Sequence, residues 1–264
     1  MNPRQAPSPH SAASDGAPLD QPALLAALRS RVARLERTGQ ARTSCDTIPV
    51  CEGLEVPGGG LAGAALHEVL AAAPGCGTAF CALLLGRTAG TVLWIASGAD
   101  DLLAWPPGLA RMGLAPERLV LVRAARWADA LWAMEEALRC PAVTGALLSP
   151  GWEASAVQAG LDLTATRRLQ LAAEAGGALG LLLRADGERL RREHSAAVTR
   201  WRISPLPTFG GEQDMDASRW ELELLRTRGG VPGGPWAVTW HGNDGLTLDE
   251  GACATPRHQQ GLRR

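Results

Sequence analysis

The sequence contains no lysine, because all 26 of its basic residues are arginine. A chain without lysine cannot form a Schiff base, cannot hold pyridoxal phosphate covalently, and cannot complete an ordinary Walker A loop. Three large enzyme classes are therefore excluded. Tyrosine is also absent, and nine tryptophans stand against two phenylalanines. Together with the arginine bias, this usage is typical of a GC-rich genome, which is an alternative explanation for every arginine discussed below.

Patterns typical of metal sites and membrane helices are missing as well. The six cysteines form no CxxC pair and the five histidines are scattered, so we expect reduced thiols, no metal site and no bound cofactor. No apolar run approaches the roughly 20 residues of a membrane helix, and no signal peptide is evident. With 26 basic and 27 acidic residues, the net charge of −1 excludes a globally basic nucleic-acid coat. We therefore expect a soluble, cytoplasmic protein.

The chain divides into one core domain with shorter flanking segments. Residues 1–20 are rich in proline and small polar residues, and we expect them to be disordered. An amphipathic helix is predicted within 21–40, a core domain over 41–250, and a flexible tail over 251–264. One face of the predicted helix carries a stripe of apolar candidates for partner binding, Leu24, Leu28, Val32 and Leu35. This stripe could pack on the protein's own core, on a second copy, or on another protein.

Apolar runs alternate with helical patterns along the core, which predicts an α/β fold with a largely parallel sheet and helices on both faces. Strands are expected at 66–70, 91–96, 118–122, 145–148 and 179–183, and those at 91–96 and 118–122 are expected to be buried. Helices are expected at 79–87, 109–113, 127–139 and 164–175. Period-two alternation at 199–203, 220–224, 236–240 and 246–248 predicts antiparallel strands that extend the same sheet.

A glycine-rich turn at 73–78 follows the first core strand, where such folds usually bind phosphate. Gly75 and Gly77 would free backbone N–H groups for an anion, and Thr78 could hold magnesium. No lysine is present to reach the terminal phosphates, and Ser149-Pro150 stands where the metal-binding aspartate of a Walker B strand is expected. We interpret the turn as vestigial and expect no catalytic residues.

Arginines gather in the C-terminal half of the core. Between residues 184 and 202, six arginines stand against three acidic residues. Such a loop could contact a phosphate backbone or an acidic partner, or it could be an ordinary solvated loop. The candidate contact residues for DNA or for an acidic partner are Arg167, Arg168, Arg189, Arg191 and Arg192.

Several long segments resemble the ImuA family, which are RecA-like accessory proteins of bacterial mutagenic translesion synthesis. One of them is WAMEEALRCP at 132–141. Further similar segments, in the family's order, are PGGGL at 57–61, LHEV at 66–69, LDLTATRRLQLAAE at 161–174, AAVTRWR at 196–202 and WELELLRTRGG at 220–230. The resemblance covers roughly residues 24–248.

The resemblance implies a RecA-like core, preceded by a helix, that acts without catalysis in a mutasome induced by DNA damage. It implies contacts with ImuB (an inactive homologue of Y-family polymerases), with a DnaE-type error-prone polymerase and with RecA, and nucleoid association after damage. The leading helix resembles the one that links RecA protomers. Two alternatives stay open: a divergent RecA-like protein that binds ATP, and a DNA-binding module that recruits the polymerase.

Overall fold

The computed structural model describes residues 47–54, 56, 59–97, 105–149, 161–208, 217–242 and 245–253. For residues 250–253 it describes the backbone alone. The predicted disordered segment 1–20 lies outside the described residues, as does the predicted flexible tail at 251–264 except for 251–253, which belong to a strand. So does the predicted helix at 21–40 with its stripe of Leu24, Leu28, Val32 and Leu35.

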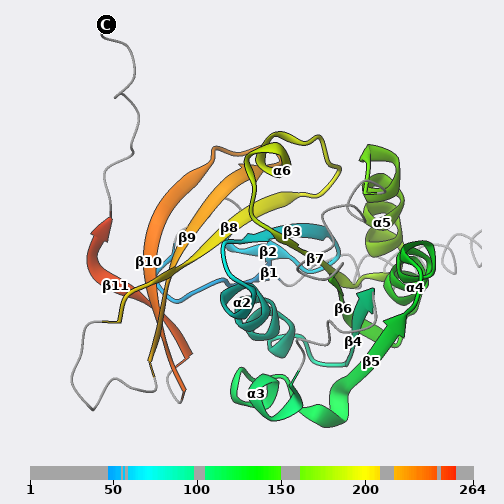
Figure 1. Ribbon diagram of the computed structural model, residues 1–264, viewed down its shortest axis with the longest axis horizontal. Coiled ribbons are helices and arrows are strands. Elements are labelled where there is room, and N and C mark those ends of the chain that lie inside the picture. The colour runs from blue at the N-terminus through cyan, green and yellow to red at the C-terminus, as the bar shows by residue number, and fades with distance from the viewer. Residues whose placement is uncertain are drawn as a thin grey trace, which may run out of the picture. The chain divides into compact units, whose positions relative to one another are not determined.

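Within the described residues, nine strands form one mixed sheet in the order β11-β10-β9-β8-β3-β7-β6-β4-β5 (Figure 1). Their bounds are β3 Leu66–Ala71, β4 Thr91–Ser97, β5 Leu119–Ala124, β6 Val143–Ser149, β7 Leu179–Ala185, β8 Thr199–Leu206, β9 Ser218–Thr227, β10 Gly233–His241 and β11 Gly245–Cys253. A separate pair consists of β1 Thr47–Ile48 and β2 Leu61–Ala62. The helices are α2 Pro74–Gly86, α3 Pro106–Arg111, α4 Trp127–Arg139, α5 Leu163–Gly176 and α6 Glu188–Arg192, with a 3₁₀ turn, η2, at Pro116–Arg118.

The sheet is parallel from β5 to β8 and antiparallel from β8 to β11. This order and the alternation of strands with helices confirm the predicted RecA-like α/β class. The prediction that every C-terminal strand is antiparallel was wrong for β8, which runs parallel to β3 and antiparallel only to β9. Alternation shows which face of a strand is buried, but it carries no information about strand direction.

Apolar side chains form a core on each face of the sheet. On one face, Phe80 and Leu84 of α2 pack with Trp94 and Trp201. On the other face, Met134 of α4 and residues of α5 pack with alternate side chains of β4, β6 and β7. Helices therefore cover both faces, as predicted, with α2 on one side and α4 and α5 on the other (Figure 1).

Local signals fix the ends of the long helices. The structure places α4 at the predicted residues, 127–139. Asp162 caps α5, because its carboxylate accepts a hydrogen bond from the Ala165 N–H at 2.7 Å. Gly177 ends α5 in a left-handed conformation, with a φ of 76°, which glycine adopts at little cost.

Strand β5 lies at one edge of the sheet and pairs, among the described residues, with β4 alone. The expectation of a buried strand at 118–122 was wrong, because Val120 and Leu121 are 45% and 37% exposed. An apolar run does not distinguish an edge strand from a central one.

Arg118 joins the end of α2 to the start of β5. Its guanidinium donates hydrogen bonds to the carbonyls of Gly90 at 2.9 Å and Gly86 at 3.2 Å, and also to the carbonyl of Thr88. The last turn of α2 contains no basic residue of its own. A distant arginine therefore satisfies carbonyl groups at and beyond the carboxyl end of this helix.

Candidate functional site

The predicted phosphate-binding turn is not a turn in the structure. Strand β3 ends at Ala71 and helix α2 begins at Pro74, so that Gly75, Gly77 and Thr78 belong to the beginning of the helix. The expected helix start at residue 79 was therefore wrong by five residues. Proline at the first helical position needs no N–H partner, and it allows the helix to start close behind the strand.

Gly77 serves close packing at this position. A Cβ atom at Gly77 would lie 2.4 Å from the Ala71 Cβ and 2.7 Å from the Leu183 Cδ1, whereas one at Gly75 would meet nothing within 4 Å. The thiol of Cys76 donates to the Ala73 carbonyl at 3.1 Å, and burial raises its pKa, so the thiol stays protonated at neutral pH. The Thr78 hydroxyl is buried and has no hydrogen-bond partner among the described residues. Of the three residues Gly75, Gly77 and Thr78, Gly75 is the one with space beside its Cα within the described part of the chain.

The cluster of arginines is largely an internal ion-pair network. Glu68 on β3 is fully buried, and its carboxylate accepts a hydrogen bond from Arg200 Nε at 2.6 Å. Arg184 lies 3.6 Å from Glu68 and 2.8 Å from Glu193. Arg200 also donates to the backbone carbonyls of Arg191 at 3.0 Å and Glu193 at 2.8 Å. Two of the six arginines, Arg184 and Arg200, are therefore buried in ion pairs and do not contribute to the basic surface.

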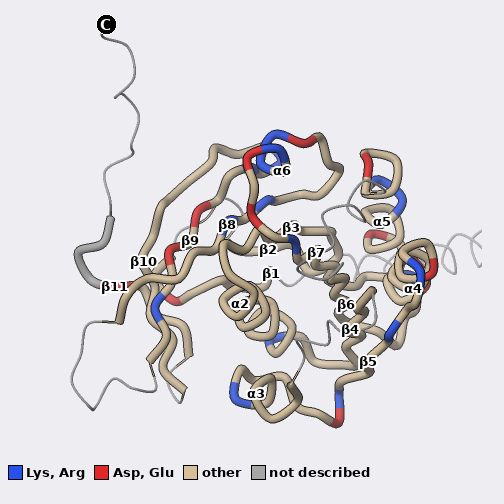
Figure 2. Tube along the Cα trace, viewed as in Figure 1, with Lys and Arg blue, Asp and Glu red and all other residues tan. Residues whose placement is uncertain are grey.

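A second carboxylate neutralises two further arginines. Asp186 accepts hydrogen bonds from Arg191 Nε at 2.8 Å and from Arg202 Nε at 2.9 Å. Burial alone would raise the pKa of Asp186, but these hydrogen bonds outweigh it and hold the pKa below its ordinary value. Figure 2 shows acidic and basic segments next to each other around α6.

The five predicted contact arginines lie on two helices. Arg189, Arg191 and Arg192 lie on α6 and are exposed, although Arg191 is paired with Asp186 and Arg192 lies 3.6 Å from Glu188. Arg167 and Arg168 lie on α5. Both are exposed, and the guanidinium of Arg168 reaches Glu135 on α4. The structure thus divides the predicted set into an α6 group and an α5 group.

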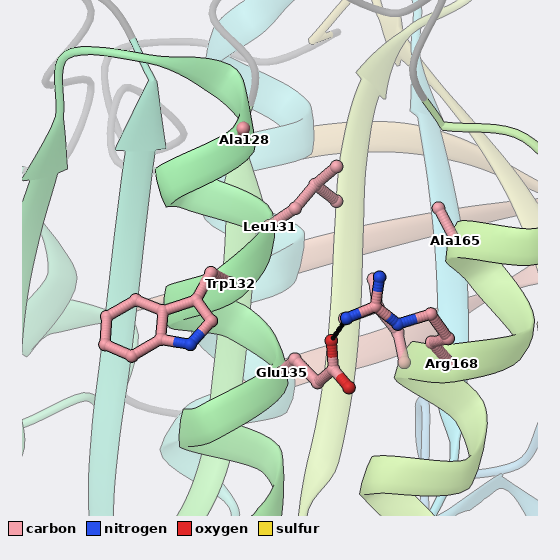
Figure 3. A pocket seen from close by; sticks show the side chains of 7 residues that line it. Ala128, Leu131, Trp132, Glu135, Ala165 and Arg168 are labelled. Atoms are coloured by element: carbon pink, nitrogen blue, oxygen red, sulfur yellow. Dashed lines mark hydrogen bonds and ion pairs between the residues drawn. The ribbon is translucent and has the colours of Figure 1, made fainter.

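A groove lies between α4 and α5 (Figure 3). Its volume is about 170 Å³. The residues that line it are Ala128, Leu131, Trp132, Glu135, Ala165, Arg168 and Leu169. Glu135 is nearly buried, and both Arg139 and Arg168 donate hydrogen bonds to it. The groove is therefore mostly apolar, with a neutralised ion pair at one end.

Trp132 is 64% exposed beside this groove, and in Figure 3 its indole points away from α5. Trp132 begins the segment at 132–141 that resembles the ImuA family, but no site was predicted there. One signal could have revealed it, because Trp132 falls off the apolar stripe formed by Trp127, Leu131, Met134 and Leu138. A large aromatic side chain on the polar side of an amphipathic helix is a candidate for protein contact.

His67, beside Glu68 on β3, is fully buried. The Ala62 carbonyl lies 2.9 Å from its Nε2 and accepts a hydrogen bond from it. Its Nδ1 therefore accepts from the Thr199 hydroxyl at 2.8 Å, and that hydroxyl accepts from the Trp201 indole N–H at 2.9 Å. Burial lowers the pKa of His67 to about 4, although the hydrogen bond to Ala62 opposes the shift. The imidazole is thus a neutral, structural group.

Neither a metal cluster nor a membrane helix is found in the described part of the chain. No group of three or more His, Cys, Asp or Glu side chains there is placed to hold a metal ion. None of the helices described is both long and apolar enough to span a bilayer. What the described surface does offer is the groove with its exposed tryptophan, and the arginines of α5 and α6.

Comparison with known proteins connects this architecture to a family. No protein-family model matches the chain. Two curated relatives, each named Protein ImuA, come from Caulobacter vibrioides strains NA1000 / CB15N and ATCC 19089 / CIP 103742 / CB 15. Each is 39% identical to this chain over 199 residues, a match that spans 67% of this chain and 76% of the relative. The chain therefore belongs to the ImuA family.

Proposed function

We propose that this protein is a non-catalytic accessory protein of the damage-inducible mutasome, and that it supports error-prone translesion DNA synthesis. In this proposal it works by contacts with ImuB, with a DnaE-type polymerase and with RecA. Family membership is the observation that carries the proposal. The start of α2 at Pro74 is consistent with it, because the residues expected to form a phosphate-binding loop belong to a helix packed on the sheet.

We assign the contact with ImuB to the groove between α4 and α5. The groove can accept an apolar side chain of the partner, and the indole of Trp132 adds a large surface that complex formation would bury. Because few residues dominate most protein interfaces, and tryptophan is prominent among them, Trp132 is the residue whose removal should matter most.

The test is co-purification of the full chain with ImuB from the same organism. Trp132→Ala should weaken binding at least about tenfold, which corresponds to roughly 1.4 kcal/mol or more. Val231→Ala is a matched control, because Val231 is 76% exposed in the connection between β9 and β10. Unchanged binding by the Trp132 variant would reject the assignment of the groove. Failure of the unaltered protein to bind ImuB, the polymerase and RecA would reject the proposed function itself.

The apolar stripe Leu24, Leu28, Val32 and Leu35 remains our proposed contact with RecA. Charged substitutions at Leu24 and Leu28 should abolish capture by RecA and leave capture by ImuB intact, because the two contacts use different parts of the chain. Equal loss of both partners would show that the two surfaces do not act separately.

A second candidate function, recruitment of the polymerase to DNA, is favoured by the exposure of Arg189 and Arg192 on α6. Binding should fall steeply with salt if these guanidinium groups contact phosphate. Arg189→Ala and Arg192→Ala should weaken binding more than Arg191→Ala, because Arg191 already pairs with Asp186. Fluorescence anisotropy on a labelled single strand measures the effect. If the affinity for the labelled strand changes neither with salt concentration nor with these substitutions, this candidate is rejected.

A further inference from the structure

The outer edge of β5 combines unpaired backbone groups with exposed apolar side chains. Among the described residues, β5 has β4 as its sole partner strand, so that the N–H and C=O groups on its other side have no strand to bond. Val120 and Leu121 are both exposed on this strand. Natural edge strands usually carry lysine, proline or bulges that prevent pairing with another chain. β5 reads LVLVRA, and Arg123 is its one charged residue.

The apolar surface at this edge extends over both faces of the sheet. Leu121 lies beside Trp94, whose side chain belongs to the core under α2. Val120 lies beside Leu93, which packs on the core under α4. An edge that is apolar on both faces suits a further strand that continues the sheet, because such a strand would cover both faces at once.

We propose that β5 pairs with β5 of a second copy of this chain, in antiparallel orientation, across a two-fold axis at Val120. This register places Val120 opposite Val120 and Leu119 opposite Leu121, so that apolar residues meet apolar residues on each face. A two-fold interface must be complementary to itself, and this short segment meets that condition. The inference is independent of the proposed function.

Charge selects this register among the alternatives. With Val120 on the axis, Glu117 of each copy, in the 3₁₀ turn just before β5, lies next to Arg123 near the end of the other copy's β5. Both side chains are exposed, and within the described residues neither forms an ion pair or a side-chain hydrogen bond. Moving the axis by one residue, to Leu121, places Arg123 opposite Leu119. Parallel pairing in register would bring Arg123 next to Arg123, and like charges in directly opposed positions are destabilising. Figure 2 shows charged segments at both ends of β5.

The size of the contact sets the strength of the dimer. With the axis at Val120, three residues of each β5, Leu119 to Leu121, pair directly, and the rest of the strand lies beside the 3₁₀ turn of the other copy. Such a contact falls at the small end of specific interfaces, so the dimer should be reversible with a dissociation constant of micromolar order or weaker. Sedimentation velocity of the full chain over a wide concentration range should therefore show monomer and dimer in exchange. A chain that stays monomeric at every concentration would overturn the proposal.

Charge reversal tests the register. Glu117→Arg alone and Arg123→Glu alone should each weaken the dimer about tenfold or more, and the double variant should restore it, because the exchanged charges again face each other. Glu188→Arg on α6 is the matched control and should change nothing. Thermal unfolding of each variant verifies that it folds. A dimer that the single reversals leave unchanged, or that the double variant fails to restore, would contradict this register.

A cysteine at the axis gives a covalent readout. Directly opposed residues of antiparallel strands have Cα atoms about 4.5 to 5.5 Å apart, which a disulfide can span. Val120→Cys should therefore form a 120–120 disulfide under mild oxidation, identified by mass spectrometry of the linked peptides. Leu24→Asp with Leu28→Asp should leave the dimer intact. Loss of the dimer in that variant, or absence of the 120–120 link, would show that another segment occupies the edge.

Discussion

At the scale of single residues, the structure changes the meaning of the arginine-rich region. In the sequence, six arginines against three acids indicate a basic surface between residues 184 and 202. In the structure, Arg184 and Arg200 are buried against Glu68, a residue from a strand more than a hundred positions earlier. Charge counted along a short segment cannot include partners that the fold brings from elsewhere. The basic surface is therefore smaller than the sequence indicates.

Removing Glu68 should be costly, because it would leave two guanidinium groups buried without their shared carboxylate. We expect Glu68→Ala to lower the free energy of unfolding by about 3 to 5 kcal/mol, as for other buried ion pairs that lose one partner. Glu188→Ala, which removes an exposed partner of Arg192, should cost no more than about 1 kcal/mol. Urea denaturation measures both. Equal effects of the two substitutions would mean that the buried network is not a source of stability.

His67 should make the protein sensitive to mild acid. Its folded pKa of about 4 lies below the ordinary value of 6.5, so the unfolded chain takes up a proton at a higher pH than the folded protein does. The stabilising contribution is fully present above pH 6.5 and is lost as the pH falls from 6.5 to 4. The loss amounts to about 3 kcal/mol. It should be measured as the pH dependence of urea denaturation.

A His67→Gln variant should lose most of this dependence between pH 6.5 and 4. His194→Gln is the matched control, because His194 is exposed, and it should retain the slope of the unaltered protein. A slope that persists in the His67 variant would place the responsible group elsewhere.

At the scale of elements, the start of α2 shows how packing can override a sequence signal. Glycines near Pro74 predict a turn, because glycine is unfavourable inside a helix. Gly77 nevertheless lies in the first part of α2, where its missing side chain lets the helix approach Ala71 and Leu183. The cost of glycine in the helix is offset by this close approach of helix and strand.

The two glycines at the start of α2 should respond to alanine in opposite ways. Gly77→Ala should destabilise the protein by about 1 to 3 kcal/mol, because its Cβ would overlap Ala71 and Leu183. Gly75→Ala should stabilise it by about 0.5 to 1 kcal/mol, because alanine favours the helix and meets nothing at that position. Thermal unfolding compares the two. If both substitutions stabilise the protein, α2 packs less closely on Ala71 and Leu183 than the structure shows.

The sequence predicted most elements but not all of their surroundings. The order of the elements, the bounds of α4 and the end of α5 followed from periodicity and from the glycines at 176–177. The exposure of β5 and the direction of β8 did not, because both depend on which strands become neighbours in the sheet. The groove between α4 and α5 was not predicted either, because it depends on which helices become neighbours: Arg168 comes from α5 and Glu135 from α4.

At the scale of the whole described sheet, stability should decrease from the centre to the edges. Strand β3 is buried along its whole length and lies between β7 and β8. Strand β11 lies at an edge of the described sheet, where it pairs with β10 and otherwise makes a single bridge, from Thr247 to Glu52. Amide hydrogens of β3 should therefore exchange more slowly than those of β11, by about a hundredfold or more. Hydrogen exchange followed by mass spectrometry tests this. Protection of β11 equal to that of β3 would indicate an additional partner at that edge.

The bonds from Arg118 to the end of α2 have a consequence for what happens at β5. A strand that docks on this edge would hold Arg118 in place, and Arg118 in turn anchors the carbonyl groups around Gly86 and Thr88. Self-association would then affect the position of α2, the helix that begins where other proteins with this type of fold bind nucleotide. In such a protein, the position of α2 would depend on whether a second molecule is bound at β5.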